Sequence, residues 1–136
     1  MDEALLAAYR STDYRVRLGG GGHASIHVDQ PLPALLVPTV NGHAWGFLTA
    51  WNPRSRPHSP AWNHQAQRLL LRALRELPAT RLIAAGVGVG TGQWKERSLF
   101  VVGPDVRQLD ALARRFEQHG YVYGRGNGMA RLRLPP

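Results

Sequence analysis

The 136-residue sequence contains no cysteine, a single lysine and only nine acidic residues. Without cysteine the chain can form no disulfide, thiolate metal site or iron–sulfur cluster, and it has no cysteine nucleophile. Acidic residues are scarcest in the middle of the chain, where Glu76 and Glu96 are the only two between Gln30 and Pro104. This scarcity argues against a paired-carboxylate glycosidase, which needs two neighbouring acidic side chains.

Long apolar runs are also missing from the sequence. No run approaches the ~20 residues that a membrane-spanning helix needs. Residues 1–6 are acidic and lack the basic start and apolar core of a signal peptide. We therefore expect a cytoplasmic protein with no membrane partner.

Positive charge, by contrast, is abundant, because Lys and Arg total 17 and give a formal net charge of +8. Only Lys95 is lysine, and this skew is explained either by GC-rich codon usage or by selection for arginine's planar, phosphate-binding guanidinium. Residues 50–82 carry six arginines against one glutamate, a net charge of +5. The segment could therefore form a surface for phosphates, or simply an ordinary solvated face.

Hydrophobic periodicity predicts one domain, residues 1–136, in which strands and helices alternate imperfectly. The predicted strands cover residues 14–18, 24–28, 45–51, 82–85, 99–102, 121–123 and 129–134. The predicted helices cover residues 2–10, 60–77 and 105–119, with a helical turn near 34–37. We therefore predict an α+β fold, with a single mixed, largely antiparallel sheet covered by two main helices and a short N-terminal helix.

The side chains of the two main helices divide into buried and exposed faces. We predict that Ser59 caps the first helix, and Asp105 and Gln108 are spaced for a capping box at the start of the second. Asp110 and Arg114 are predicted to pair on the outside of the second helix. Trp94 is expected to be exposed on a loop. The apolar stripe predicted to be buried on the first helix comprises Trp62, Ala66, Leu69, Leu70, Ala73, Leu74 and Leu77.

Several well-known functional motifs fail on spacing. The glycines of residues 86–92 do not match the dinucleotide fingerprint, because its last glycine position holds Thr91 or Gln93. No Gly-Lys-Ser/Thr phosphate loop is present, so we interpret this stretch as a flexible or bulged connection. The six histidines lack metal-site spacing, and no Gly-x-Ser-x-Gly nucleophile elbow occurs. We therefore predict no metal and no cofactor.

Two groups of polar residues remain as candidates for a site. The first follows the predicted central strand on a tight turn and is joined by residues farther along the chain. The second is a row of arginines spaced along one face of the first main helix. The ligand-binding candidates are Asn52, Arg54, Ser55, Arg56, Asn63, Arg68, Arg72, Arg75 and Trp94, with Glu96 and Ser98 nearby.

Trp51-Asn52-Pro53-Arg54-Ser55 and several other stretches resemble domain-of-unknown-function family 3293, a family of small bacterial proteins. The resemblance implies a standalone protein with no established activity. The family usually has Glu before the helix Asn and Arg three residues after it, whereas this chain has Trp62 and Ala66. It also usually has an Asp-containing turn where this chain has residues 89–91, and these departures favour binding over catalysis. The other similar positions are 9–14, 47–50, Asn63, Trp94, Glu96, Ser98, 99–103, 113–116, Gln118 and 122–123.

The leading hypothesis from the sequence is a small, basic, non-catalytic binding module for an anionic partner, with nucleic acid or a nucleic-acid-containing assembly as the first choice. Asn52, Arg54, Arg56 and the helix arginines would contact phosphates.

Two alternatives stay open. In the first, an enzyme acts on a small anionic metabolite, with Glu96 as acid or base, Asn52 and Ser55 orienting the substrate and Arg54 clamping its anionic group. This alternative requires all four of these side chains to converge in one pocket, with Glu96 within ~10 Å of Asn52. In the second, the protein is a protein–protein adaptor, anchored by exposed tryptophans such as Trp94.

Overall fold

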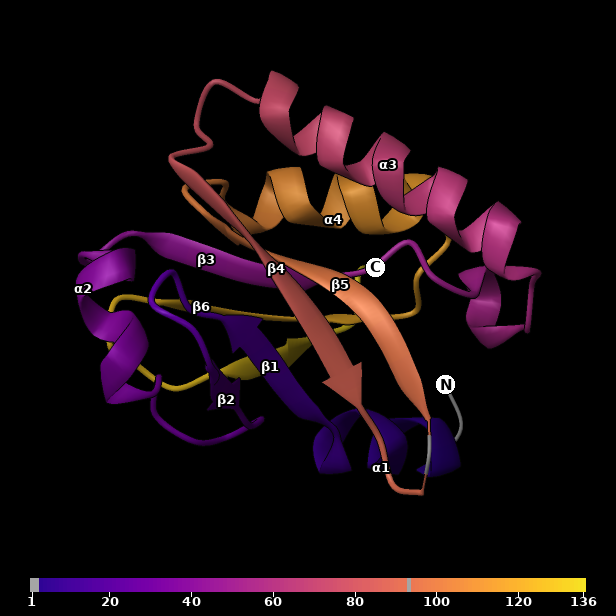
Figure 1. Cartoon of the computed structure of the whole chain (residues 1–136), viewed down its shortest axis with the longest axis horizontal. Coiled ribbons are helices and arrows are strands. Elements are labelled where there is room, and N and C mark those ends of the chain that lie inside the picture. The colour runs from indigo at the N-terminus through magenta and orange to yellow at the C-terminus, as the bar shows by residue number, and fades with distance from the viewer. Residues whose placement is uncertain (1–2, 93) are drawn as a thin grey trace.

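The computed structural model describes residues 3–92 and 94–136, which form an α+β fold around one seven-stranded sheet (Figure 1). The strand order is β2-β1-β4-β5-β3-β6-β7. Every ladder between the described strands is antiparallel, so the predicted mixed character of the sheet is wrong. The strands are β1 (Asp13–Arg17), β2 (His23–Ile26), β3 (Ala44–Leu48), β4 (Leu82–Val89), β5 (Lys95–Val102), β6 (Tyr121–Arg125) and β7 (Arg131–Arg133).

Helices cover the sheet on both sides. The two long helices, α3 and α4, lie together on one face, whereas α1 lies on the other side beneath the ends of β4 and β5 (Figure 1). This arrangement matches the predicted two main helices and short N-terminal helix. The helices are α1 (Glu3–Ser11), α2 (Val37–Val40), α3 (Pro60–Glu76) and α4 (Val106–Arg115), with single 3-10 turns at Ala34–Leu36 and Pro53–Ser55.

The sheet curls so that its two ends share one core. Ile26 from β2 belongs to the same buried cluster as Trp45 from β3 and Val122 from β6. A bridge between Pro31 and Met129 links the chain beyond β2 to the segment before β7. The concave face is therefore filled like a half-barrel, while the convex face forms a second core with α3 and α4. A site on the concave face can open only at an end of this curled sheet.

The predicted start signals of both long helices are confirmed. The Ser59 hydroxyl accepts from the Trp62 backbone N–H at 3.2 Å, and Asp105 forms a capping box with Gln108. The buried stripe of α3, however, is rotated from the prediction. Asn63 is buried and Trp62 is 50% exposed, because the helix directs the amide rather than the indole toward the preceding loop.

The glycine-rich stretch extends the sheet instead of breaking it. Glycine has low strand propensity, which led the sequence to predict a connection at residues 86–92. The structure shows instead that β4 runs to Val89 and pairs with β5 over eight residues from each strand. The long ladder supplies the backbone hydrogen bonds that outweigh the low propensity. It also places Glu96 and Ser98 on a strand, not on the predicted loop.

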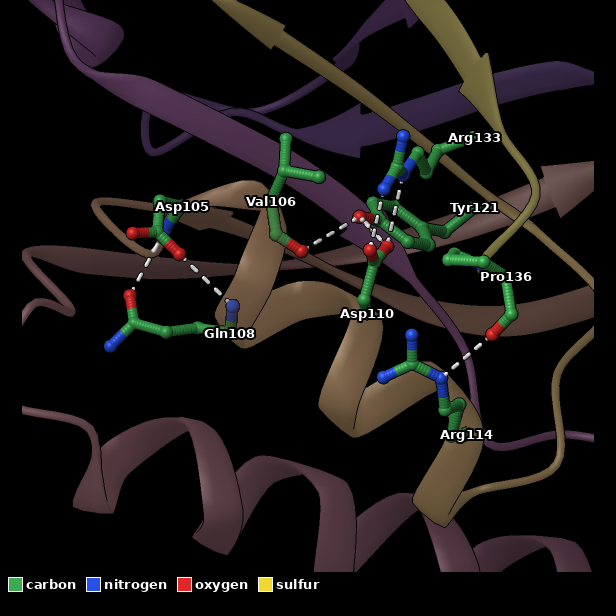
Figure 2. A network of polar contacts seen from close by, with 8 residues as sticks. All are labelled: Asp105, Val106, Gln108, Asp110, Arg114, Tyr121, Arg133 and Pro136. Carbon is green, nitrogen blue, oxygen red and sulfur yellow. Dashed lines mark hydrogen bonds and ion pairs between the residues drawn. The ribbon is translucent and has the colours of Figure 1, made fainter.

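Asp110 lies at the centre of a buried polar network between α4 and the C-terminal strands (Figure 2). The Tyr121 hydroxyl donates to its Oδ1 at 2.7 Å, and Arg133 donates to both carboxylate oxygens, with Nη2 2.7 Å from Oδ2. The predicted outer pair with Arg114 is wrong. Arg114 instead donates to the carbonyl of Pro136, and Asp110 is only 5% exposed.

Candidate functional site

The loop that follows β3 is held in an unusual backbone conformation. Asn52, Arg54 and Ser55 all have positive φ angles, of 47°, 57° and 57°. Each such residue costs about 1–3 kcal/mol when it is neither glycine nor relieved by its surroundings. The surrounding structure must therefore fix the loop, and residues holding such strain are often found at functional sites.

Asn63 of α3 is the side chain that fixes this loop. Its Oδ1 accepts from the Asn52 backbone N–H at 2.9 Å, and its Nδ2 donates to the Asn52 side-chain oxygen at 2.8 Å. The same Asn52 oxygen accepts from the His58 backbone N–H at 3.1 Å. Because Oδ1 of Asn52 is occupied twice, its side-chain N–H groups remain to donate elsewhere.

A cavity of about 310 Å³ opens beside this loop, where the concave core of the sheet ends. Its walls come from α1, β1, the end of β3, the loop 52–57, and the paired ends of β4 and β5. The polar side chains that line it are Tyr9, Ser11, Thr12, Tyr14, Thr49, Asn52, Ser55, Thr91, Glu96, Ser98, Gln118 and Tyr121.

Strand alternation and a missing side chain direct Glu96 into the cavity. On β5 it shares a face with Ser98 and with Phe100, which belongs to the concave core. Across the ladder it pairs with Gly88, where a β-carbon would stand 3.6 Å from the Thr12 methyl group. Gly88 and Glu96 both line the cavity, and the glycine adds no side chain to it.

The carboxyl group of Glu96 is isolated from positive charge. Burial raises its pKa from 4.5 to about 7, against the opposing effect of a hydrogen bond from the Asn52 side chain. Among the described residues that line the cavity there is no arginine, lysine or histidine. Glu96 therefore changes its charge near neutral pH, which suits a group that gives or takes protons.

Two phenols complete the inner wall. The Tyr9 hydroxyl accepts from the Gly120 backbone N–H at 3.1 Å, and the Tyr14 hydroxyl donates to the Tyr9 carbonyl at 2.6 Å. Burial raises the pKa of Tyr9 to about 12 and also raises the pKa of Tyr14, with Glu96 adding to both effects. Both phenols are therefore neutral wherever Glu96 titrates.

The structure unites some of the predicted site residues and separates others. Asn52, Ser55, Trp94 and Glu96 all line the cavity. The convergence that the enzyme hypothesis requires is therefore met for Glu96, Asn52 and Ser55 but not for Arg54. Asn63 lies behind the loop as its support. The remaining predicted residues, Arg54, Arg56, Arg68, Arg72 and Arg75, do not line the cavity.

The arginines have other surroundings. Arg54 pairs with Glu117, with Nη2 and Oε1 2.9 Å apart, so it does not clamp a ligand in the cavity. Arg56 is exposed on the loop. Arg68, Arg72 and Arg75 are exposed on α3, which lies across the sheet from α1 (Figure 1). The two groups of candidates from the sequence therefore belong to two separate surfaces.

Sequence reasoning missed the contribution of α1 and β1 to the cavity. Tyr9, Thr12 and Tyr14 line it, although periodicity marked Tyr9 and Tyr14 only as apolar positions of a helix and a strand. One signal pointed to them, because the resemblance to family 3293 includes residues 9–14. Gln118, also part of that resemblance, lines the cavity as well.

The described residues contain neither a metal-binding cluster nor a membrane-spanning helix. No three His, Asp or Glu side chains within residues 3–92 and 94–136 are grouped closely enough to hold a metal ion. In the same part of the chain no helix has the length and apolar character required to cross a bilayer.

Comparisons with known proteins give one match. The model of a family described as "Protein of unknown function (DUF3293)" matches residues 48–120, which is just over half of the chain. The matched segment includes Asn52, Asn63 and Glu96, whereas α1 and β1 lie outside it. No curated protein and no solved structure is significantly similar to the chain.

Proposed function

The chain belongs to the DUF3293 family, and since membership assigns no activity, we propose from the cavity's geometry that the protein binds a small organic molecule there and exchanges a proton with it through Glu96. The observation that carries the proposal is a partly buried carboxyl group that faces an open cavity beside the Asn52 side chain. A carboxyl group with a pKa close to ambient pH can act either as a general base or as a general acid.

The chain of contacts behind Glu96 supports this proposal. Asn63 holds the strained loop, the loop fixes Asn52, and the Asn52 amide hydrogen-bonds Glu96. A reacting group must be held to within about 0.5 Å of its productive position, so such support is expected around it. In this proposal Glu96 is the catalytic residue, Ser55 contacts the substrate, and Asn52 and Asn63 are positioning residues.

The proposal is tested with variants that fill the cavity. Ala8 on α1 lines the cavity, whereas its neighbour Ala7 does not, so Ala8→Phe should block ligand entry and Ala7→Phe should not. We expect uncharged aromatic fragments to shift the amide NMR signals of Gly88 and Ser98 in the wild type and in Ala7→Phe, but not in Ala8→Phe.

A carbon-detected titration of the Glu96 carboxyl group accompanies this screen. We expect an apparent pKa near 7. A carboxyl group that titrates near 4.5, together with fragments that bind equally well to Ala8→Phe, would rule out the proposed function.

A second function is favoured by the arginines of α3. Arg68, Arg72 and Arg75 are exposed along one helix, and no carboxylate in the described part of the chain forms an ion pair with them. Guanidinium groups that form no ion pair and lie along one helix can contact successive phosphates of a nucleic-acid backbone. We propose nucleic acid as the partner of this surface, acting independently of the cavity.

Fluorescence anisotropy with labelled oligonucleotides tests the second function. Changing Arg68, Arg72 and Arg75 together to Ala should weaken binding and reduce the slope of log affinity against log salt by about 2–3, roughly one per lost contact. A charge-matched control replaces three exposed arginines elsewhere, namely Arg10, Arg17 and Arg125. Equal losses in both variants would show that net charge, not this surface, causes the binding.

A further inference from the structure

We propose that the ligand of the cavity is a small organic amine, held as an ammonium ion between Glu96 and the aromatic walls. This inference rests on the proposed function of the same cavity and specifies the class of molecule. It differs from the anionic metabolite that the sequence suggested, because the arginine expected to clamp an anion pairs with Glu117 outside the cavity.

The charges around the cavity favour a cation. Among the described residues that line it, Glu96 is the only one with a carboxyl group, and none has a basic side chain. Lys95 and Arg97 flank Glu96 on β5, but strand alternation directs them to the opposite face of the sheet. The +8 net charge of the chain repels a cation mainly over long distances. Physiological salt screens this repulsion beyond about 8 Å.

The hydrogen-bonding groups of the cavity are mostly acceptors. At least five of its hydroxyl groups already donate their protons to backbone carbonyls, which leaves only their lone pairs for a ligand. These donors are Ser11 and Thr12 to Ala8, Tyr14 to Tyr9, Thr49 to Arg97 and Ser98 to Glu96. The Gln118 side-chain amide likewise donates to the carbonyls of Trp51 and Phe116. A ligand with several N–H donors fits such a surface better than a carboxylate or phosphate.

The aromatic residues supply the third argument. Tyr14 and Phe47 meet edge to face with their centroids 5.2 Å apart, and both line the cavity. The indole of Trp94 lies against Gly90, where a β-carbon would come within 2.5 Å of the ring, and remains 46% exposed. Aromatic rings attract cations by about 0.5–2 kcal/mol each when the cation lies over a ring face.

Three probes of equal size separate the ligand classes, namely benzylamine, benzyl alcohol and benzoate. We expect benzylamine to bind in an NMR titration about tenfold more tightly at pH 8 than at pH 6, because the ionised fraction of Glu96 rises about tenfold across a pKa near 7. The phenols of Tyr9 and Tyr14, which line the cavity, have raised pKa values and stay neutral over this range.

Glu96→Gln should weaken benzylamine binding at least tenfold at pH 8 and abolish the pH dependence, while Ala7→Phe should change neither. Benzylamine that binds no more tightly than benzyl alcohol or benzoate, or that does not bind at all, overturns the amine assignment. The titration of the Glu96 carboxyl group in the same samples separates the two proposals. A pKa near 7 then leaves the proposed function standing, whereas an ordinary value near 4.5, together with fragments that bind equally well to Ala8→Phe, removes both.

Discussion

Replacing Glu96 by Gln is expected to stabilise the protein by about 2–3 kcal/mol at pH 8, even though the residue lies in the candidate site. Burial raises the pKa of Glu96 from 4.5 to about 7 in the folded protein. Above pH 7 the folded state must therefore hold a charged, buried carboxylate that water solvates in the unfolded state. One pKa unit corresponds to about 1.36 kcal/mol, which sets the scale of the gain.

The sign of the pH dependence follows from proton binding. Between about pH 4.5 and pH 7 the folded state holds a proton on Glu96 that the unfolded state has released. Stability from this group therefore falls as the pH rises through that window and is constant above it. Glutamine cannot ionise, and it keeps an oxygen that can accept the hydrogen bond from Asn52.

Urea denaturation of both proteins at pH 4, 6 and 8 measures this effect. The two free energies of unfolding should nearly coincide at pH 4 and separate at pH 8, with the variant more stable. Glu76→Gln is the matched control, since Glu76 is exposed at the end of α3 and should show no such divergence. A Glu96→Gln variant less stable than wild type at pH 8 would mean that the carboxylate is stabilised by its surroundings. A destabilised functional group is what a reactive site requires, and a stabilised one would speak against it.

The helices and their caps could be predicted because the signals lie close together in sequence. Ser59 before Pro60, and Asp105 three residues before Gln108, define helix starts through contacts within one turn. The position of the loop between the central strand and the first long helix was likewise predicted correctly. In each case the relevant interaction partner is at most a few residues away.

Features that depend on distant partners were missed. The spacing of Asp110 and Arg114 predicted an exposed pair, but Arg133 reaches Asp110 from a strand 23 residues later. Trp62 has the hydrophobic character of a buried residue. It is displaced from the inward position by Asn63, which is needed to hold the loop 11 residues before it. Hydrogen bonds to residues distant in sequence therefore determined which side chains are buried, against the local hydrophobic and charge pattern.

The cavity could not be derived from sequence for a similar reason. The alternating glycines at positions 86 and 88 resembled a flexible connection. As part of β4, these two residues place no side chain on the concave face of the sheet. Phe47 occupies the room beside Gly86, where a β-carbon would stand 2.8 Å from its ring. Gly88 lines the cavity with Glu96 and adds no side chain to it. Glycine at every second position of a strand is thus a signal for a cavity only once the pairing is known.

Replacing Asp110 by Ala is expected to destabilise the protein by about 2–3 kcal/mol at pH 7. The substitution leaves the Tyr121 hydroxyl and the Arg133 guanidinium without their shared acceptor between α4 and the C-terminal strands (Figure 2). Removing one partner of a buried charged network costs up to about 3–5 kcal/mol. We expect less here because Arg133 keeps access to water.

The dependence on pH should run opposite to that of Glu96. Hydrogen bonds from Arg133 hold the pKa of Asp110 below its ordinary value of 3.8, with the hydroxyl of Tyr121 adding to the effect. This stabilisation is present above the ordinary pKa and is lost as the pH falls through the lowered one. Asp110→Asn, which keeps the shape but not the charge, should therefore be destabilised at pH 7 and approach wild type only as the pH falls through the lowered pKa of Asp110.

Arg114→Ala provides the control on the same helix, because Arg114 is exposed and donates only to the Pro136 carbonyl. It should lose no more than about 0.5 kcal/mol. A comparable loss in Arg114→Ala and Asp110→Ala would locate the stabilisation in α4 generally and not in the buried carboxylate. If both predictions hold, Asp110 is buried among partners that favour its charged form, whereas Glu96 is partly buried without such partners. Folding stability then accounts for the burial of Asp110 but not for that of Glu96, which supports a functional role for Glu96.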